Sequence, residues 1–497
     1  MTLAWGLFLA YLVGTAWLGL KGYRKTSGFG SFAVGDRAMN PYVVGVILAA
    51  STSSASTFII NPGFVYVDGF GAWFHMVVAV GISFITMLSV LSFRFRRIGA
   101  ETMALTIPDW IGKRYQSPSF ALFFAFLNLL SFAFVVLLVG GISIVMQALL
   151  GVSNVTALLI TLGFVTSYVF VGGTYAHVLT NMLQGSLMII VTVMVLIACV
   201  LVALREPGSV IDGLRAIDPG LVAAVNRDGA LFNDVFSIYV AGFAIGAIVV
   251  CQPHILTKAL YVKDDRDVKI YLIVFAVVFT LFQLLGTVGF MAHFTVPDGD
   301  LIDSATGAFR QDLVMTQFLK SEFSDIVFTF VSVVLLAAAM STLDGLLVSM
   351  STITANDLVL NLRRRLGRSA PDVEAEMAFA LKASHVVLVV IAVAAFLINL
   401  SPPRLLGIFG QTGIYGLTAA AALPLLLGIL FRHLPLALVW AGSAAALAIH
   451  FGLFFFGDRL FPSSSLTFGN PGVTAAIASL TTIPCIALVA TIVSKRR

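Results

Sequence analysis

The sequence predicts an all-α membrane protein that crosses the bilayer many times, and three observations support this fold class. Of the 497 residues, 59% are hydrophobic and only 11% are charged, whereas soluble domains carry about 25% charged residues. The apolar residues gather in runs of about 20, the length of a helix that spans the hydrocarbon core of a bilayer. Most lysines and arginines lie in short segments between these runs. We therefore interpret the net charge of +5 as a topology signal, and we expect no nucleic-acid partner.

About thirteen spans are expected along the chain. They cover residues 3–20, 41–66, 70–93, 118–150, 154–172, 177–204, 236–257, 269–294, 325–355, 378–399, 403–431, 433–456 and 471–494. The first run is not a cleaved signal peptide, because its charges (Lys21, Arg24 and Lys25) follow the apolar residues. The spans fill the chain as one transporter-type domain, and we see no appended soluble domain.

The distribution of positive charge predicts the orientation in the membrane. Basic clusters occur in the loops that follow odd-numbered spans, around residues 21–37, 94–114, 258–269 and 363–382. Cytoplasmic loops are enriched in lysine and arginine. We therefore expect a multi-pass protein of the plasma membrane, of the bacterial inner-membrane type, with its N-terminus outside and its C-terminus in the cytoplasm.

Two spans contain polar residues that an ordinary membrane helix lacks. Hydroxyl side chains crowd residues 51–57, and Pro62-Gly63 follows. Such residues weaken the helical ladder, and broken helices in transporters expose carbonyls at the midplane, where ions and substrates bind. Packing of small residues between helices is the alternative explanation for this run.

The second polar segment contains Ser341, Thr342 and Asp344. The hydroxyls are hard oxygen ligands, which suit an alkali cation. A carboxylate inside a span is costly and therefore marks a functional candidate. Alternatively, Asp344 is hydrogen-bonded to a neighbouring helix or reaches a water-filled vestibule. A third segment, 172–185, begins with Gly172-Gly173 and is by itself a polar turn followed by a helix.

These segments resemble the sodium:solute symporter family over nearly the whole chain, roughly residues 5–490. Residues 172–185 resemble the family's GG…TD..Q signature, and Ala339–Thr342 with Leu346-Leu347 resembles its MST…LL segment. Residues 252–256 read QPHIL, as in the proline symporters, and residues 54–59 with Pro62-Gly63 resemble the pantothenate type.

The resemblance implies a LeuT-type fold with two inverted five-helix repeats. The repeats would cover 41–204 and 236–431, with an extra helix at 3–20 and two more at 433–494. It also implies a sodium site between the first helix of repeat one and the third helix of repeat two. The implied ligands are the carbonyls of Ala50, Ser53 and Ala338 and the hydroxyls of Ser341 and Thr342. Arg37 matches a family arginine at the cytoplasmic entrance.

Four positions depart from the proline-symporter pattern. Thr52 and Asn181 replace aspartates, and Ile245 and Val249 replace aromatic residues that contact substrate in the proline type. The resemblance then implies one sodium ion per cycle, with Asp344 partly replacing the charge missing at Asn181. It also favours a monocarboxylate or a pantothenate-like acid over proline.

The resulting hypothesis is a sodium-coupled symporter that imports a small organic acid by alternating access. It is not an enzyme, needs no organic cofactor and works as a monomer. We expect the substrate to contact Thr52, Ser54, Gln252, Gln411 and Tyr415, and we expect Arg37, Asn181 and Asp344 to serve coupling or gating. Three alternatives remain open: a sodium- or proton-coupled amino-acid symporter of the proline type with Asp344 as the proton carrier, a channel, and a solute sensor that does not transport.

Overall fold

The computed structural model describes residues 2–54, 56–206, 208–229, 231–302, 307, 309–367, 372–403, 406–431 and 434–495. Within these residues the chain is helical, and its only β pairing is an isolated bridge between Ile302 and Phe309. Residue 433, at which one span is predicted to begin, lies outside the described residues. The all-α fold class predicted from the sequence is therefore confirmed.

The α-helices of the first half are α1 (Thr2–Tyr23), α2 (Phe29–Val34), α3 (Pro41–Thr52), α4 (Asn61–Asp68), α5 (Phe70–Trp73), α6 (Val80–Glu101), α7 (Ile107–Arg114), α8 (Pro118–Leu127), α9 (Ser131–Leu150), α10 (Asn154–Arg205) and α11 (Val210–Ile217). Those of the second half are α12 (Ala241–Val249), α13 (Pro253–Leu256), α14 (Asp265–Gln283), α15 (Val288–Thr295), α16 (Val314–Glu322), α17 (Asp325–Ile353), α18 (Asn361–Arg365), α19 (Val373–Asn399), α20 (Leu406–Leu430), α21 (Leu436–Leu460) and α22 (Pro471–Lys495).

Short 3₁₀ or π segments continue several of these helices. They are η1 (Ser56–Ile60), η2 (Phe74–Ala79), η3 (Asn128–Leu130), η4 (Pro219–Val222), η5 (Phe236–Val240), η6 (Thr257–Tyr261), η7 (Leu284–Thr287), η8 (Asp298–Leu301), η9 (Gln311–Leu313) and η10 (Thr354–Leu360). Because such segments join α8 to α9 and α14 to α15, each pair forms one long apolar helix that can cross a membrane.

The number of crossings depends on how broken helices are counted. Ten helices in the described chain are long and apolar enough to span a bilayer, or up to twelve if each of two bent pairs is one span. Helix α10 has 52 residues, about 78 Å of helix, which exceeds twice a ~30 Å hydrocarbon core. Gly173 interrupts it with φ 49° and ψ −134°, between the two spans predicted at 154–172 and 177–204. The count of thirteen stays a prediction.

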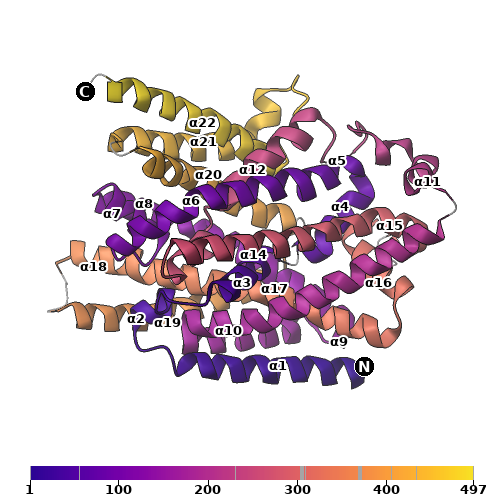
Figure 1. Cartoon of the computed structure of the whole chain (residues 1–497), viewed down its shortest axis with the longest axis horizontal. Coiled ribbons are helices and arrows are strands. Elements are labelled where there is room, and N and C mark those ends of the chain that lie inside the picture. Colours follow the sequence, from indigo (N-terminus) through magenta and orange to yellow (C-terminus); the bar gives the residue numbers. More distant parts are fainter. Residues whose placement is uncertain are drawn as a thin grey trace.

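The helices run roughly side by side along the long axis of the molecule (Figure 1). The N-terminal end of α1 and the C-terminal end of α22 lie at opposite ends of this bundle (Figure 1). A chain that crosses a membrane an odd number of times begins and ends on opposite sides of it. The predicted count of thirteen crossings is odd and agrees with this placement of the two ends.

The first helix break lies where the hydroxyl residues cluster. Helix α3 ends at Thr52, and the segment Ser56–Asp68 leaves it at an angle of 59°. The Ser51 hydroxyl donates to the Ile47 carbonyl at 2.7 Å, and the Thr52 hydroxyl donates to the Leu48 carbonyl at 2.5 Å. These bonds give the last turn of α3 side-chain partners, as expected for serine and threonine within a helix.

A second break interrupts the span predicted at 236–257. The segment Phe236–Val249 meets Pro253–Tyr261 at 60°, with Gln252 in an extended conformation at the N-cap of α13. Pro253 lacks the N–H that a continuous helix would need. The span predicted at 236–257 is therefore broken at this point, and the proline of the QPHIL sequence was the available signal of the break.

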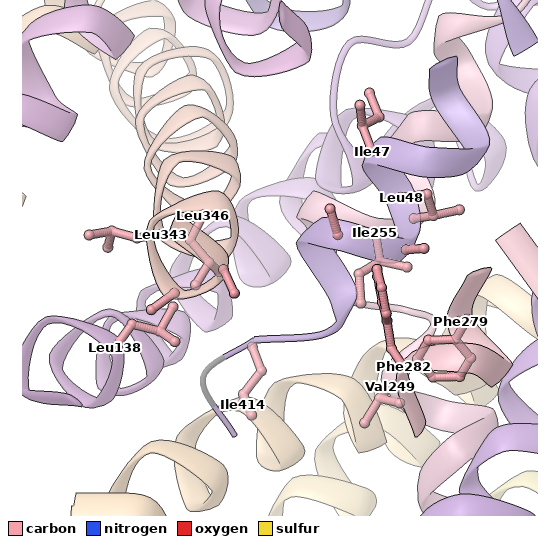
Figure 2. Packing of buried hydrophobic residues seen from close by; sticks show 14 of the residues in the cluster. Ile47, Leu48, Leu138, Val249, Ile255, Phe279, Phe282, Leu343, Leu346 and Ile414 are labelled. Carbon is pink, nitrogen blue, oxygen red and sulfur yellow. The ribbon is translucent and has the colours of Figure 1, made fainter. Parts of the chain in front are cut away.

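Helix α17 lies at the centre of the packing. Its residues Val331–Val348 are all buried, and it packs against α1, α3, α9, α10, α13 and α19. Figure 2 shows Leu343 and Leu346 of α17 beside Leu138 of α9, while Ile255 of α13 lies near Leu48 of α3. The broken helices are thus held against an apolar core that includes the middle of α17.

Candidate sodium and substrate site

The hydroxyl of Ser341 joins α17 to the end of α3. Ser341 Oγ lies 3.0 Å from the carbonyl oxygen of Ala50 and 2.7 Å from that of Ala338. All three residues are fully buried. Because a hydroxyl has a single hydrogen, it donates to one of these carbonyls at a time. Three of the five predicted ligand residues therefore place oxygen atoms next to one another.

The other two predicted ligand residues have side-chain hydroxyls without partners, although the atom predicted to bind at Ser53 is its carbonyl oxygen. Among the described residues, Ser53 Oγ and Thr342 Oγ1 are buried and make no hydrogen bond. Ser53 follows the last residue of α3, and Thr342 follows Ser341 on α17. Buried hydroxyls are normally satisfied, and hard oxygen atoms are the ligands an alkali cation prefers. The residues present therefore fit a sodium ion.

A cavity of about 990 Å³ lies beside these residues. Its lining includes all five residues predicted to contact substrate: Thr52, Ser54, Gln252, Gln411 and Tyr415. They come from both broken helices and from α20. The hydroxyl-bearing Thr342 lines the same cavity. The structure thus brings the predicted substrate residues together and places them next to a predicted sodium ligand.

Further lining residues show where this cavity leads and what sequence reasoning missed. Ile245 and Val249, the positions that lack aromatic residues, both line it. Arg310 and Lys320, from the segment predicted to be extracellular, also contribute, so the cavity reaches that end of the bundle. Asn61 lines it as well. Asn61 directly precedes the Pro62-Gly63 pair, so its position in the sequence was an available signal.

Asp344, three residues after the predicted sodium ligand Ser341, lies in a network of side-chain hydrogen bonds. Its side chain is fully buried. Tyr168 Oη donates to Oδ2 at 2.9 Å, Thr180 Oγ1 lies 3.2 Å from the same oxygen, and His177 Nδ1 lies 2.9 Å from Oδ1. Asn181 Nδ2 lies 3.0 Å from both carboxylate oxygens. This geometry fits a carboxylate hydrogen-bonded to a neighbouring helix, because every partner belongs to α10.

The same network reaches the broken helix. Ser51 Oγ lies 3.1 Å from Asn181 Oδ1 and can donate its single hydrogen to that oxygen in place of the Ile47 carbonyl, so Asn181 connects Asp344 to the last turn of α3. The residue that departs from the family signature and the membrane carboxylate are therefore in direct contact. The sequence singles out each residue for a different reason, and the structure shows that the two side chains are hydrogen-bonded to each other.

Arg37 lies apart from this network. It adopts φ 58° between α2 and α3, and its guanidinium donates to the carbonyls of Ala104 at 2.6 Å and Gly99 at 3.3 Å. Desolvation by burial lowers the pKa of Arg37 from its usual value, and Asp109 acts in the opposite direction. Arg37 thus ties α2 to the end of α6, at the end of the bundle that the charge pattern predicts to be cytoplasmic.

Comparison with known proteins finds a matching family model, related sequences and a solved structure with the same fold. A sequence model described as the sodium:solute symporter family matches residues 32–435. The sodium/pantothenate symporter of Haemophilus influenzae is 27% identical over 434 residues, which cover 85% of this chain and 84% of that protein. The sodium/proline symporter of Escherichia coli is 25% identical over 360 residues, 71% of this chain and 69% of that protein.

A solved structure shares the fold. It is the substrate-bound, outward-open state of a Na⁺-coupled sialic acid symporter, with a TM-score of 0.74 and 16% identity. The alignment covers 98% of both chains. The expectation of a LeuT-type transporter fold is confirmed by this likeness, whereas the two five-helix repeats remain a prediction.

Proposed function

We propose that this chain, which belongs to the sodium:solute symporter family, uses a sodium gradient to import a small organic acid. Family membership makes it a membrane transporter and not an enzyme. The proposal of sodium-driven import rests on one observation: a predicted sodium ligand and the predicted substrate residues line the same cavity. Thr342 is a predicted sodium ligand, and it lines the same 990 Å³ cavity as Gln252 and Gln411.

Sodium binding would connect the two halves of the chain. In the proposal, the carbonyls of Ala50, Ser53 and Ala338 and the hydroxyls of Ser341 and Thr342 hold one sodium ion. The two helix breaks, one after Thr52 and one after Val249, occupy corresponding positions at the start of the two proposed repeats, 41–204 and 236–431. Paired interrupted helices of this kind are typical of the substrate site in inverted-repeat transporters. The ion would stabilise the bent form of the first helix.

The substrate would bind in the large cavity beside the ion. Ser54 and Ser56, at the start of the helix that follows the first break, line this cavity, and the positive end of a helix dipole favours a carboxylate. Ile245, Val249 and Ile255 line it too, which suits a solute with an apolar body. The likeness to sodium/pantothenate symporters supports a carboxylate.

Alternating access would then couple the two solutes. In the proposed orientation, with the N-terminus outside and the C-terminus in the cytoplasm, the cavity opens outward through the segment that contains Arg310. Moving one sodium ion down a potential of 100 mV releases about 2.3 kcal/mol, and its concentration gradient adds to that. We propose that a monomer suffices, that no organic cofactor takes part, and that Asn181 and Asp344 transmit the presence of the ion to α10.

Uptake into proteoliposomes under an imposed sodium gradient tests this function. The panel contains acetate, lactate, pyruvate, pantothenate, proline and glucose, and a potassium gradient serves as the control. Saturable, sodium-driven uptake of a carboxylate supports the proposal. Sodium-driven uptake of proline alone favours the amino-acid alternative, and uptake driven by a proton gradient without sodium overturns sodium coupling. Binding without uptake of any panel member identifies a sensor, and non-saturable flux identifies a channel.

A further inference from the structure

A second, much smaller cavity lies on the other side of the sodium residues. Its volume is about 20 Å³, and its lining includes His177, His254, Lys258, Gly345 and Thr352. On α17, the lining residues follow Thr342 in the direction of the arginine-rich helix α18, which continues α17 through η10. This cavity therefore lies toward the end of the bundle that the charge pattern predicts to face the cytoplasm.

Lys258 brings a buried amino group to this cavity. Its side chain is 1% exposed, and within the described chain its only hydrogen bond runs from Nζ to the carbonyl oxygen of His254, at 2.6 Å. An ammonium group has three donors, so two remain. Buried lysines are normally paired with a carboxylate. The nearby charge of Asp344 is already hydrogen-bonded by four side chains of α10.

Unpartnered polar atoms line the same cavity as the Lys258 amino group. Among the described residues, Thr352 Oγ1, His254 Nδ1 and His177 Nε2 are buried without a hydrogen-bond partner, and all three residues line the small cavity. The Thr352 hydroxyl can donate a hydrogen bond. An ammonium group with free donors and a free hydroxyl together form a donor set that suits a carboxylate.

His254 separates this small cavity from the large one. It lines both of them. On α17, Thr342 lines the large cavity and Gly345 the small one, a separation of about 4.5 Å along the helix axis. The two cavities therefore lie next to each other along α17. His254 is the residue that lines both of them.

We propose that Lys258 and Thr352 form an inner carboxylate-binding site on the release route, which receives the substrate's carboxylate after it passes His254. This inference rests on the proposed import of an organic acid. In the present conformation the small cavity has room for about one water molecule, so the inner site is closed while the large cavity is open. Opening toward the cytoplasm would enlarge it.

Variants of the inner site should change the affinity for the carboxylate at the cytoplasmic face and leave the affinity at the outer face nearly unchanged. Lys258→Gln should weaken the apparent affinity for the carboxylate on the cytoplasmic side at least tenfold, while the affinity from outside changes less than twofold. Lys258→Arg should keep the inner affinity within about threefold, because it retains a charged donor. Thr352→Val should weaken inner affinity severalfold, and Thr354→Val is its control, because Thr354 is a buried threonine of the same region outside both cavity linings.

Right-side-out and inverted membrane vesicles measure these affinities, with the best-transported carboxylate of the panel as the probe. Wild-type protein provides a test that needs no variant: relative to the carboxylate, the carboxamide of the same compound should lose at least tenfold more affinity at the inner face than at the outer face. Equal inner affinities for wild type and a folded Lys258→Gln protein would overturn the inference, as would an equal loss at both faces. If Lys258→Gln does not fold, the carboxamide comparison decides alone. A panel without any sodium-driven carboxylate overturns the proposed function itself.

Discussion

The hydroxyl oxygen of Ser341 lies 3.0 Å from the carbonyl oxygen of Ala50. This contact joins the middle of α17 to the last turn of α3, directly before the first helix break. The two residues are 291 positions apart in the chain and belong to different proposed repeats. An ion bound between them would therefore link the two halves of the molecule, and the predictions below follow from that relationship.

Asp344 is expected to support sodium binding through its charge. Asp344→Asn removes a negative charge close to the proposed ion, and we expect an approximately tenfold loss of sodium affinity, equivalent to about 1.4 kcal/mol. Asn181→Asp alone places two carboxylates within hydrogen-bonding distance and should destabilise the protein. The double exchange Asn181→Asp with Asp344→Asn restores one carboxylate and one amide, and should recover most of the sodium affinity.

Sodium-dependent uptake and thermal unfolding in detergent measure these effects together. If Asp344→Asn leaves the sodium affinity unchanged, Asp344 has only a structural role. If the double exchange behaves no better than Asp344→Asn, the position of the charge matters more than its presence in the network.

Gln252 is expected to contribute to substrate affinity. Its Oε1 is buried without a partner within the described chain and its side chain lines the large cavity. Gln252→Ala should raise the KM for the transported solute about fivefold, because Oε1 can accept a hydrogen bond from a hydroxyl or amide group of the substrate, and one such bond contributes about 1 kcal/mol. The matched control is Gln147→Ala, since Gln147 bonds to Ser143 on its own helix and does not line the cavity. An equal effect of both substitutions would remove Gln252 from the substrate site.

Gly173 is expected to be required for the turn within α10. Its φ of 49° lies in a region that residues with a Cβ rarely adopt, and an added Cβ would lie 2.8 Å from the carbonyl oxygen of Phe32. Gly173→Ala should therefore lower the free energy of unfolding by about 1–3 kcal/mol. Gly163→Ala on the same helix is the control, because an added Cβ there meets nothing within 4 Å. Thermal denaturation followed by size-exclusion chromatography compares the two, and equal stability would contradict the strained turn.

The proposed orientation predicts which loops an impermeant reagent reaches. Ser464 is exposed between α21 and α22, and Glu101 is exposed at the end of α6. In a background without the three native cysteines, Ser464→Cys should react with an impermeant maleimide in intact cells. Glu101→Cys should react only after permeabilisation. The reverse pattern would invert the topology and would place the large cavity on the cytoplasmic side.

Much of this arrangement could be predicted from the sequence because the signals are local. Runs of apolar residues show the spans, and the hydroxyl residues before Pro62-Gly63 show the first break. The contact between Asn181 and Asp344 could not be predicted from composition or spacing, because it depends on how α10 packs on α17. The same holds for the buried Lys258, whose place in the basic segment 258–269 suggests a solvated loop. Its burial follows from the second break, which turns residues 253–261 into the bundle.

Sodium dependence of transport in a Ser341→Ala/Thr342→Ala protein is the most direct test of the account. Both hydroxyls are proposed ligands of the ion, and neither substitution alters the backbone carbonyls. We expect the sodium concentration for half-maximal uptake to rise at least tenfold, while Ser351→Ala, a buried serine further along α17, leaves it unchanged. A double variant that folds, transports and retains the wild-type sodium dependence would contradict the proposed site.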